Sequence, residues 1–206
     1  MRPDVSPIGR KRNPIIEEAR RRQIIDAAIE AVASVGVMHA SLARIAQTAG
    51  ISKSVISYHF NGRNDLLEQV VSQIYTDSWA FLEPRLAAEP TAAGKLRAYL
   101  DGNIAYMRGH RSRLLAVSAI VLDLRTEDGT PRFSPHGDDS VVELLAGIVR
   151  AGRRAGEFRD ADPRVVAVTV NQAVVGILGA WVADPALDLA AAAIELGTLF
   201  DHALKR

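Results

Sequence analysis

The sequence lacks cysteine and is poor in aromatic residues, which make up 5% of its 206 positions. Without cysteine the chain has no disulfide scaffold, no thiolate metal site and no thiol nucleophile. Runs that alternate between apolar and polar residues are short, which argues against a β-sheet. The N-terminus also lacks the stretch of roughly 7–15 apolar residues found in secretion signals, so we expect a cytoplasmic protein.

The sequence also lacks the motifs of common enzyme classes. Neither the GxSxG motif of serine hydrolases, nor the HExxH zinc motif, nor a phosphate-binding P-loop occurs in it. The five histidines stand far apart, at positions 39, 59, 110, 136 and 202, so their spacing does not suggest a metal site. We therefore expect a protein that is not an enzyme and that uses no metal or cofactor.

Charge is distributed unevenly along a chain whose net charge is only +1. Residues 1–63 carry ten basic and five acidic side chains, whereas residues 64–206 carry fifteen basic and nineteen acidic ones. A basic first third on a mildly acidic remainder indicates a small polyanion-binding head on a larger body. The alternative is that two solvated surfaces merely differ in charge.

Helix-favouring residues dominate, and apolar residues recur at intervals of three and four, so the sequence predicts an all-α fold of about nine helices. A first helix begins at Glu17 and ends at Gly36, and two short helices follow Ser41 and Ser52. A longer helix capped by Asn64 reaches about Leu82, and Pro84 and Pro90 bracket a break after it. Further helices are expected over residues 91–109, 111–125, 140–155, 163–183 and 186–204, with a loop at 126–139.

These helices are expected to group into two domains. Residues 1–16 contain three prolines and the basic run GRKR, and are predicted to be a disordered arm. Residues 17–63 form a three-helix head, and residues 64–206 form a larger helical body. The boundary falls inside a continuous run of helices rather than in a flexible linker.

The head contains a helix-turn-helix pattern, that is, two short helices joined by a turn that contains glycine. Ser41 and Ser52 cap the two helices, and Gly50 ends the first. The apolar positions share one side of the pair and form a small core: Leu42, Ile45, Ala46, Ala49, Ile51, Ile56 and Phe60. The second helix is then free to present its opposite face.

That opposite face consists of small or hydrogen-bonding side chains with one cation and one aromatic ring. Its members are Lys53, Ser54, Ser57 and Tyr58, with Val55 at the edge. No acidic residue lies between Ile51 and Arg63. Such a face suits the major groove of DNA, which is about 12 Å wide.

Residues 41–67, SLARIAQTAGISKSVISYHFNGRNDLL, resemble the DNA-binding signature of the tetracycline-repressor (TetR) family. The matching positions are Ile45-Ala46, Ala49-Gly50-Ile51-Ser52, Tyr58-His59-Phe60 and Leu66. The similarity extends over residues 17–67, and beyond them it rests on the number of helices and on a Gly-Ala-Trp and Asp-Pro pattern in residues 179–185. The resemblance implies a DNA-binding head and a helical body that binds a small molecule and pairs two chains.

The resemblance also implies roles for individual head residues. Phosphates would be bound by Ser41, Arg44, Ser52, His59 and Arg63, whereas base edges would be approached by Lys53, Ser54, Val55 and Tyr58, with Lys53 as the guanine reader. Ser57 stands where many members have tyrosine, Ser41 where threonine is commoner, and Arg63 where lysine is usual. The basic arm contains Arg10, Lys11 and Arg12. It either enters a neighbouring minor groove of the DNA or is disordered and makes no contact with it.

Residues 163–183 are apolar almost all round, which indicates burial on more than one side. We expect this helix and the last one to form a four-helix dimer interface with a second copy. The candidate interface residues are Thr169, Gly176, Ala180, Ala183, Ile194 and Thr198. The competing interpretation is a membrane span, for which the length is suitable, but Asn171 and Gln172 near the middle of the segment disfavour it.

Candidate pocket residues interrupt or enrich the apolar stripes of the body. Asn103 interrupts the stripe of helix 91–109, and a buried amide needs a partner, either a ligand or a neighbouring carbonyl. The other candidates are Trp79, Phe81, Tyr106, Met107, His110 and Asn171. Such a lining suits a mid-sized, largely apolar ligand, although plain core packing is an alternative role for each residue.

Together these features predict a ligand-responsive, sequence-specific transcriptional regulator. We expect a repressor that binds a palindromic operator in double-stranded DNA as a homodimer and is released by a small-molecule effector. Two alternatives come from other classes: a DNA-packaging protein without sequence preference, and a small-molecule sensor that acts through a protein partner.

Overall fold

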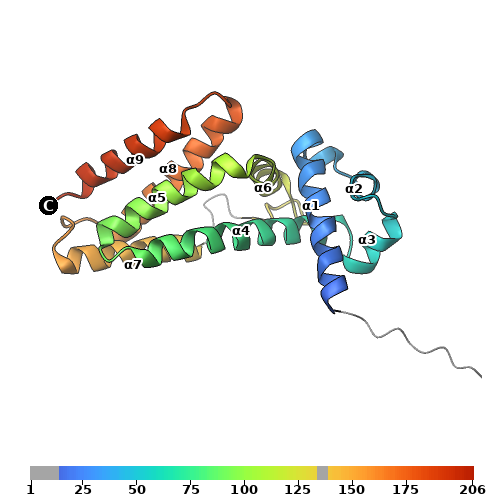
Figure 1. The fold of residues 1–206 in the computed structure, drawn as a ribbon, viewed down its shortest axis with the longest axis horizontal. Helices are drawn as coiled ribbons and strands as arrows, with labels where there is room; N and C mark the ends of the chain where they lie inside the picture. Colours follow the sequence, from blue (N-terminus) through green and yellow to red (C-terminus); the bar gives the residue numbers. More distant parts are fainter. Residues whose placement is uncertain (1–13, 134–138) are drawn as a thin grey trace, which may run out of the picture.

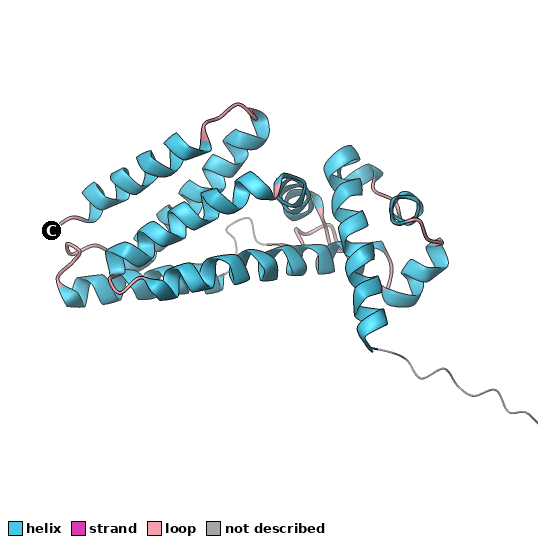
Figure 2. Cartoon of the chain, in the orientation of Figure 1, coloured by secondary structure: helices cyan, strands magenta, loops and turns pink. Residues whose placement is uncertain are grey.

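The structure, a computed structural model, describes residues 14–133 and 139–206, and over these ranges the chain forms nine α-helices and no sheet. Figure 2 shows helices joined by short loops. The all-α prediction with about nine helices is therefore confirmed. The helices are α1 (Pro14–His39), α2 (Leu42–Ala49), α3 (Lys53–His59), α4 (Arg63–Ala88), α5 (Ala92–Gly109), α6 (Arg111–Asp123), α7 (Asp139–Ala155), α8 (Pro163–Ala183) and α9 (Leu189–Leu204).

The molecule is elongated, with a small head at one end and a larger body at the other (Figure 1). Helices α1, α2 and α3 form the head, and α6 of the body lies against α1. Helix α4 leaves the head and runs along the body beside α5. With 26 residues it is about 39 Å long at 1.5 Å per residue, so one rigid element joins the head to the far part of the body.

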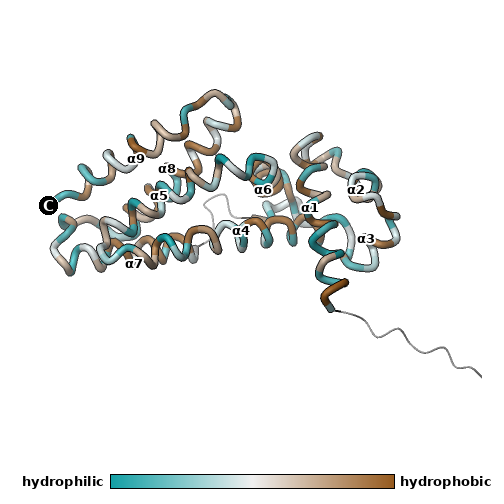
Figure 3. The backbone as a smooth tube through the Cα atoms, in the orientation of Figure 1, coloured by the Kyte–Doolittle hydropathy of each residue, from teal (hydrophilic) through white to brown (hydrophobic). Residues whose placement is uncertain are grey.

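One apolar core runs through both parts of the molecule. Ile24 and Ile29 of α1 and Ile45 of α2 belong to the same buried cluster as Leu100 of α5 and Leu145 of α7. Figure 3 shows apolar (brown) and hydrophilic (teal) stretches alternating along the helices of both parts. Because the head shares this core, it is attached to the body by packing.

The structure corrects three helix starts, one of which is that of the last helix: it was expected from residue 186 and begins at Leu189, behind the N-cap Asp188. Helix α1 begins at Pro14, so residues 14–16 are helical rather than part of the arm, and the rest of the predicted arm lies outside the described residues. Its regular geometry ends at Gly36, whose φ is 76°. Helix α4 begins at Arg63 with Gly62 as its N-cap, and Asn64 lies inside the first turn instead of capping it.

The structure also corrects the expected break near Pro84, because α4 continues through this proline to Ala88. Proline removes one backbone hydrogen bond and crowds the carbonyl four residues earlier, which here belongs to Ala80. Both Ala80 and Pro84 are exposed. The freed carbonyl can therefore turn toward water, and the helix continues because its buried residues Leu82 and Leu86 remain on the core side.

Candidate functional site

The turn between α2 and α3 depends on the geometry of Gly50. Its backbone is left-handed (φ 66°, ψ 33°), and its N–H closes α2 on the carbonyls of Ala46 and Gln47. The N–H of Ile51 also bonds to the Ala46 carbonyl, at 3.0 Å. Glycine adopts this conformation without the steric cost of a side chain, so the sequence directs the chain sharply from α2 into α3.

The caps of the two helices differ. The Ser41 hydroxyl accepts a hydrogen bond from the Arg44 N–H at 3.3 Å, as expected of an N-cap. Ser52 occupies the N-cap position of α3, but its side chain does not cap the helix. Its hydroxyl instead bonds to the Ser54 hydroxyl at 2.8 Å. This is a correction of the predicted cap, and it orders two of the hydroxyls expected near DNA.

Helix α3 lies at the outer side of the head (Figure 1), and the residues of its predicted polar face are accessible. Lys53, Ser54, Ser57 and Tyr58 are all exposed, whereas Ile56 and Phe60 are buried. Val55 is half-buried and packs against the core, so it lies at the edge of the face. Tyr58 is 59% exposed, which is a large value for an aromatic ring and leaves this side chain accessible to a partner.

Helix α1 fixes the position of this face through residues to which the sequence analysis assigned no role. Arg21 donates to the carbonyl of His59 at 2.6 Å, and its guanidinium lies 4.5 Å from the centre of the Phe60 ring. Gln23 donates to the carbonyl of Ala49 at 2.9 Å. Both bonds are made to C-terminal carbonyls of the short helices, which lack partners within those helices. The run of three arginines at positions 20–22 was the one sequence feature that could have indicated the role of Arg21.

Arg63 is positioned differently from the other predicted phosphate ligands. Ser41, Arg44 and Ser52 are exposed and His59 is half-buried, edge-on to the Tyr58 ring. The Arg63 guanidinium instead donates to the carbonyls of Ala40, at 3.0 Å, and Val37. Burial lowers the pKa of Arg63, but an arginine stays charged at any physiological pH. The structure thus places Arg63 as a brace between α4 and the end of α1.

Replacing Arg63 with alanine is expected to lower the free energy of unfolding by about 1–3 kcal/mol, because two carbonyls lose a charged donor. Urea unfolding followed by helical circular dichroism measures this loss. Arg44→Ala is the matched control, since its side chain is exposed and its removal should change stability by less than about 0.5 kcal/mol. Equal stability of the two variants would contradict the bracing role.

The body contains one buried polar pair among its described residues. Asn171 of α8 is only 9% exposed, and its side-chain oxygen accepts a hydrogen bond of 3.0 Å from the Tyr99 hydroxyl of α5. Burial raises the pKa of Tyr99, so its hydroxyl stays protonated and can donate. Asn103, one turn further along α5, donates to the Tyr99 carbonyl at 2.8 Å. The partner of this amide is therefore a neighbouring carbonyl.

A second cluster joins α4 to the end of α5. The rings of Phe81 and Tyr106 are 5.5 Å apart, and His110 stacks on Tyr106 at 3.9 Å. Tyr106 is buried, and its hydroxyl has no hydrogen-bond partner among the described residues. Of the other pocket candidates, Met107 follows Tyr106 in the sequence and is also buried. Trp79 of α4 is 39% exposed. The structure thus brings together three of the candidates and leaves Trp79 at the surface.

An ion-pair bridge connects this part of the body to the head. Arg113 of α6 contacts Asp77 of α4 at 2.5 Å and Asp26 of α1 at 3.1 Å. Burial raises the pKa of Tyr106, and the nearby Arg113 acts in the opposite direction. Asp26 and Arg113 are 87 positions apart, so no sequence pattern predicted their contact. The bridge links the elements that carry the head, the long helix and the aromatic cluster.

The outer surfaces of α8 and α9 are apolar and exposed. All six residues predicted at the dimer interface are exposed in the single chain, together with Val165 (64%), Val175 (49%) and Leu199 (58%). Helix α8 is also the one described helix that is long and apolar enough to cross a membrane. Its Asn171 bonds to α5 and its inner side packs against α7, as expected of a helix that belongs to the bundle.

Two parts of the chain match models of one protein family. Residues 24–70 match the family described as bacterial regulatory proteins, tetR family, and residues 92–193 match the tetracyclin repressor-like C-terminal domain. The regulator BetI of Escherichia coli is 40% identical over 90 residues, which cover 43% of this chain and 46% of BetI. The chain therefore aligns with less than half the length of this relative.

Solved structures of regulators share the fold along almost the whole chain. The fatty acid degradation regulator FadR of Bacillus halodurans has a TM-score of 0.77 at 20% identity, covering 93% of this chain and 97% of its own. AibR, solved with isovaleryl coenzyme A and operator DNA, has a TM-score of 0.74 at 20% identity, covering 87% of this chain and 97% of its own. With both of its parts matched by family models, this chain belongs to the TetR family of bacterial regulatory proteins.

Proposed function

We propose that this protein is a transcriptional repressor that binds a palindromic DNA operator as a homodimer and is released by a small-molecule effector. The observation that carries the proposal is the exposed face of α3, where Lys53, Ser57 and Tyr58 project from a helix fixed by Arg21 and Gln23. A rigidly positioned helix with accessible donors and one aromatic ring is suited to reading base edges. Arg44 and the exposed hydroxyl of Ser41 would then contact phosphates.

The dimer is proposed from the apolar face of α8 and α9. Monomeric proteins rarely expose a contiguous apolar surface of this kind, and the small side chains of Gly176, Ala180 and Ala183 permit close approach of a second helix. A two-fold axis through this face would relate the two heads. Two recognition helices would then read half-sites about one turn of DNA apart, roughly 34–36 Å.

The effector is proposed to bind in the body between the Tyr99–Asn171 pair and the Phe81–Tyr106–His110 cluster. Aromatic and aliphatic side chains dominate this region, so the ligand would be mainly apolar. The Tyr106 hydroxyl is buried beside Arg113 and makes no geometric hydrogen bond among the described residues, so it would be available to one polar group of the ligand. AibR, which shares the fold, was solved with an acyl coenzyme A, and this agrees with a ligand that combines apolar and polar parts.

We infer that the Arg113 bridge transmits effector binding to the head. The guanidinium contacts both Asp26 of the head and Asp77 of α4, and it lies on the helix that follows Tyr106 and His110. A ligand that shifts α5 or α6 would therefore change the bridge and the angle of the head. Such a ligand moves the equilibrium only by its difference in affinity for the two arrangements.

Double replacement at the bridge tests this inference. Asp26→Asn and Arg113→Gln are expected to be non-additive by about 0.5–3 kcal/mol in the free energy of unfolding, because both remove one interaction. Asp26→Asn should also lower the effector concentration that releases half of the operator. The control is Arg132→Gln, which breaks the ion pair between Arg132 and Glu68. This ion pair lies within the body and does not involve the head. Additive effects at Asp26 and Arg113 would contradict the role of the bridge.

The experiment that tests the proposed function is selection of bound sequences from a random duplex pool at stated salt concentration. We expect a palindromic consensus with two half-sites. A pool that stays random, with affinity falling steeply as salt rises, would instead be the behaviour of a packaging protein. No retention of DNA at any low salt concentration would favour a sensor that acts through a protein partner.

A further inference from the structure

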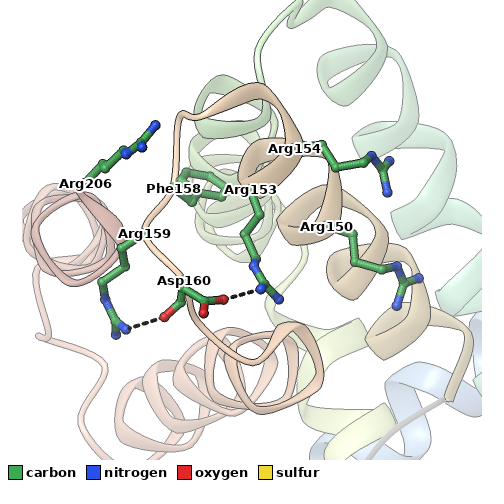
Figure 4. Close-up of a pocket in the computed structure, with 7 residues that line it drawn as sticks. All are labelled: Arg150, Arg153, Arg154, Phe158, Arg159, Asp160 and Arg206. Atoms are coloured by element: carbon green, nitrogen blue, oxygen red, sulfur yellow. Dashed lines mark hydrogen bonds and ion pairs between the residues drawn. The ribbon is translucent and has the colours of Figure 1, made fainter.

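A basic groove lies at the end of the body opposite the head. Its volume is about 610 Å³, and the residues that line it are Arg150, Arg153, Arg154, Phe158, Arg159, Asp160 and Arg206. Figure 4 shows the arginine side chains spread around the groove, with Asp160 between Arg153 and Arg159. Five guanidinium groups against one carboxylate form a strong local positive charge in a chain whose net charge is only +1.

The groove is built from three segments that are tied to one another. Its residues come from the last turns of α7, from the connection to α8, and from the residues after α9. Phe158 and Lys205 form an antiparallel bridge, and the Arg159 N–H donates to the Leu204 carbonyl at 2.9 Å. A Cβ atom at position 152 would lie 2.3 Å from the Phe158 ring. Glycine at this position therefore leaves the space that the buried ring occupies beside the groove.

The charges of the groove are only partly neutralised. Arg153 pairs with Asp160, and Arg150 pairs with Glu143. In the part of the chain that the structure describes, Arg154 and Arg206 have no ion pair. Arginines in the last turn of α7 favourably oppose the negative helix end, but this accounts only for Arg153 and Arg154. Arg159 lies in the connection between α7 and α8, and its guanidinium donates to the carbonyl of Ala203 near the end of α9, at 2.6 Å, and to the carbonyl of Asp160, at 3.3 Å. Arg206 follows the end of α9.

We propose that this groove binds a small anion that carries two or more phosphate groups. Arginine presents a planar fork of donors that fits phosphate oxygens in pairs. In Figure 4, Arg150 and Arg154 lie on one side of the groove and Arg159 and Arg206 on the other, so an anion with several phosphate groups would have donors for them on both sides. Phe158 is buried and no aromatic face is offered to a base, so the phosphates themselves are recognised.

Inorganic triphosphate titrated into the full chain by calorimetry tests the site directly. The ionic strength is kept at about 0.01 M, where charges interact over about 30 Å. The double variant Arg154→Gln/Arg206→Gln is expected to bind triphosphate at least about tenfold more weakly, because two charged donors are lost. The matched control, Arg108→Gln/Arg125→Gln, removes the same charge from exposed positions elsewhere and should retain the affinity to within about twofold.

Three results would overturn the proposal. They are no binding of triphosphate by the unmodified chain, equal weakening of triphosphate binding in both double variants, and the same affinity for orthophosphate as for triphosphate. Thermal unfolding by circular dichroism confirms that each variant is folded. Because triphosphate is tested without operator or effector, failure here is distinguishable from failure of the proposed repressor function, which the selection experiment measures separately.

Discussion

Replacing Tyr58 with alanine is expected to abolish specific operator binding while leaving the fold and the dimer intact. The ring is 59% exposed on the outer face of α3, so its removal creates no cavity. Loss of one base contact costs about 1–3 kcal/mol, and the two heads of a dimer lose it together. The summed loss of about 2–6 kcal/mol corresponds to a decrease in operator affinity of about 30-fold to 10⁴-fold, whose upper end reaches the level of non-specific binding.

The measurement for Tyr58→Ala is operator affinity by mobility shift, with random duplex DNA as the comparison. Tyr75→Ala is the matched control, because it truncates another exposed tyrosine, on α4 and 48% exposed, away from the head surface. Its operator affinity should be unchanged. If Tyr58→Ala weakened operator and random DNA equally, Tyr58 would be a backbone contact, and if the protein unfolded, Tyr58 would be a core residue.

Replacing Ala180 with glutamate is expected to separate the dimer. Ala180 is exposed on the apolar face of α8, and two carboxylates brought together across a two-fold axis would be desolvated and would repel each other. A single head loses the gain from joint binding, so operator affinity should fall by about 10²–10⁴-fold. Sedimentation equilibrium measures the mass, and mobility shift measures the affinity.

The control for Ala180→Glu is Ala80→Glu, which places the same charge on an exposed position of α4. This variant should remain dimeric and retain operator binding. A dimer that persists in Ala180→Glu would place the interface on another surface. Loss of operator binding without loss of the dimer would mean that α8 acts on the heads rather than on subunit pairing.

The head was largely predictable from sequence because its determinants are local. Ser41 caps α2, Gly50 adopts the left-handed turn, and the alternation of buried and exposed residues along α3 follows from helical periodicity. The missed boundary at Pro84 is instructive, because proline normally ends a helix. Here the apolar residues on either side keep α4 on the core, and tertiary packing outweighs the local preference.

The sequence by itself determined the all-α fold, the helix-turn-helix, the polar face of α3 and the apolar face of α8, since each is a pattern within one segment. Only the tertiary structure decided that Arg63 braces two carbonyls and that Arg113 joins Asp26 to Asp77. It also decided that Tyr99 pairs with Asn171 and that arginines from three segments form one groove. An arginine or a tyrosine looks the same in sequence whether its partner is water, a carbonyl or a ligand. Its partner is set by contacts between residues many positions apart, and those exist only once the helices have packed.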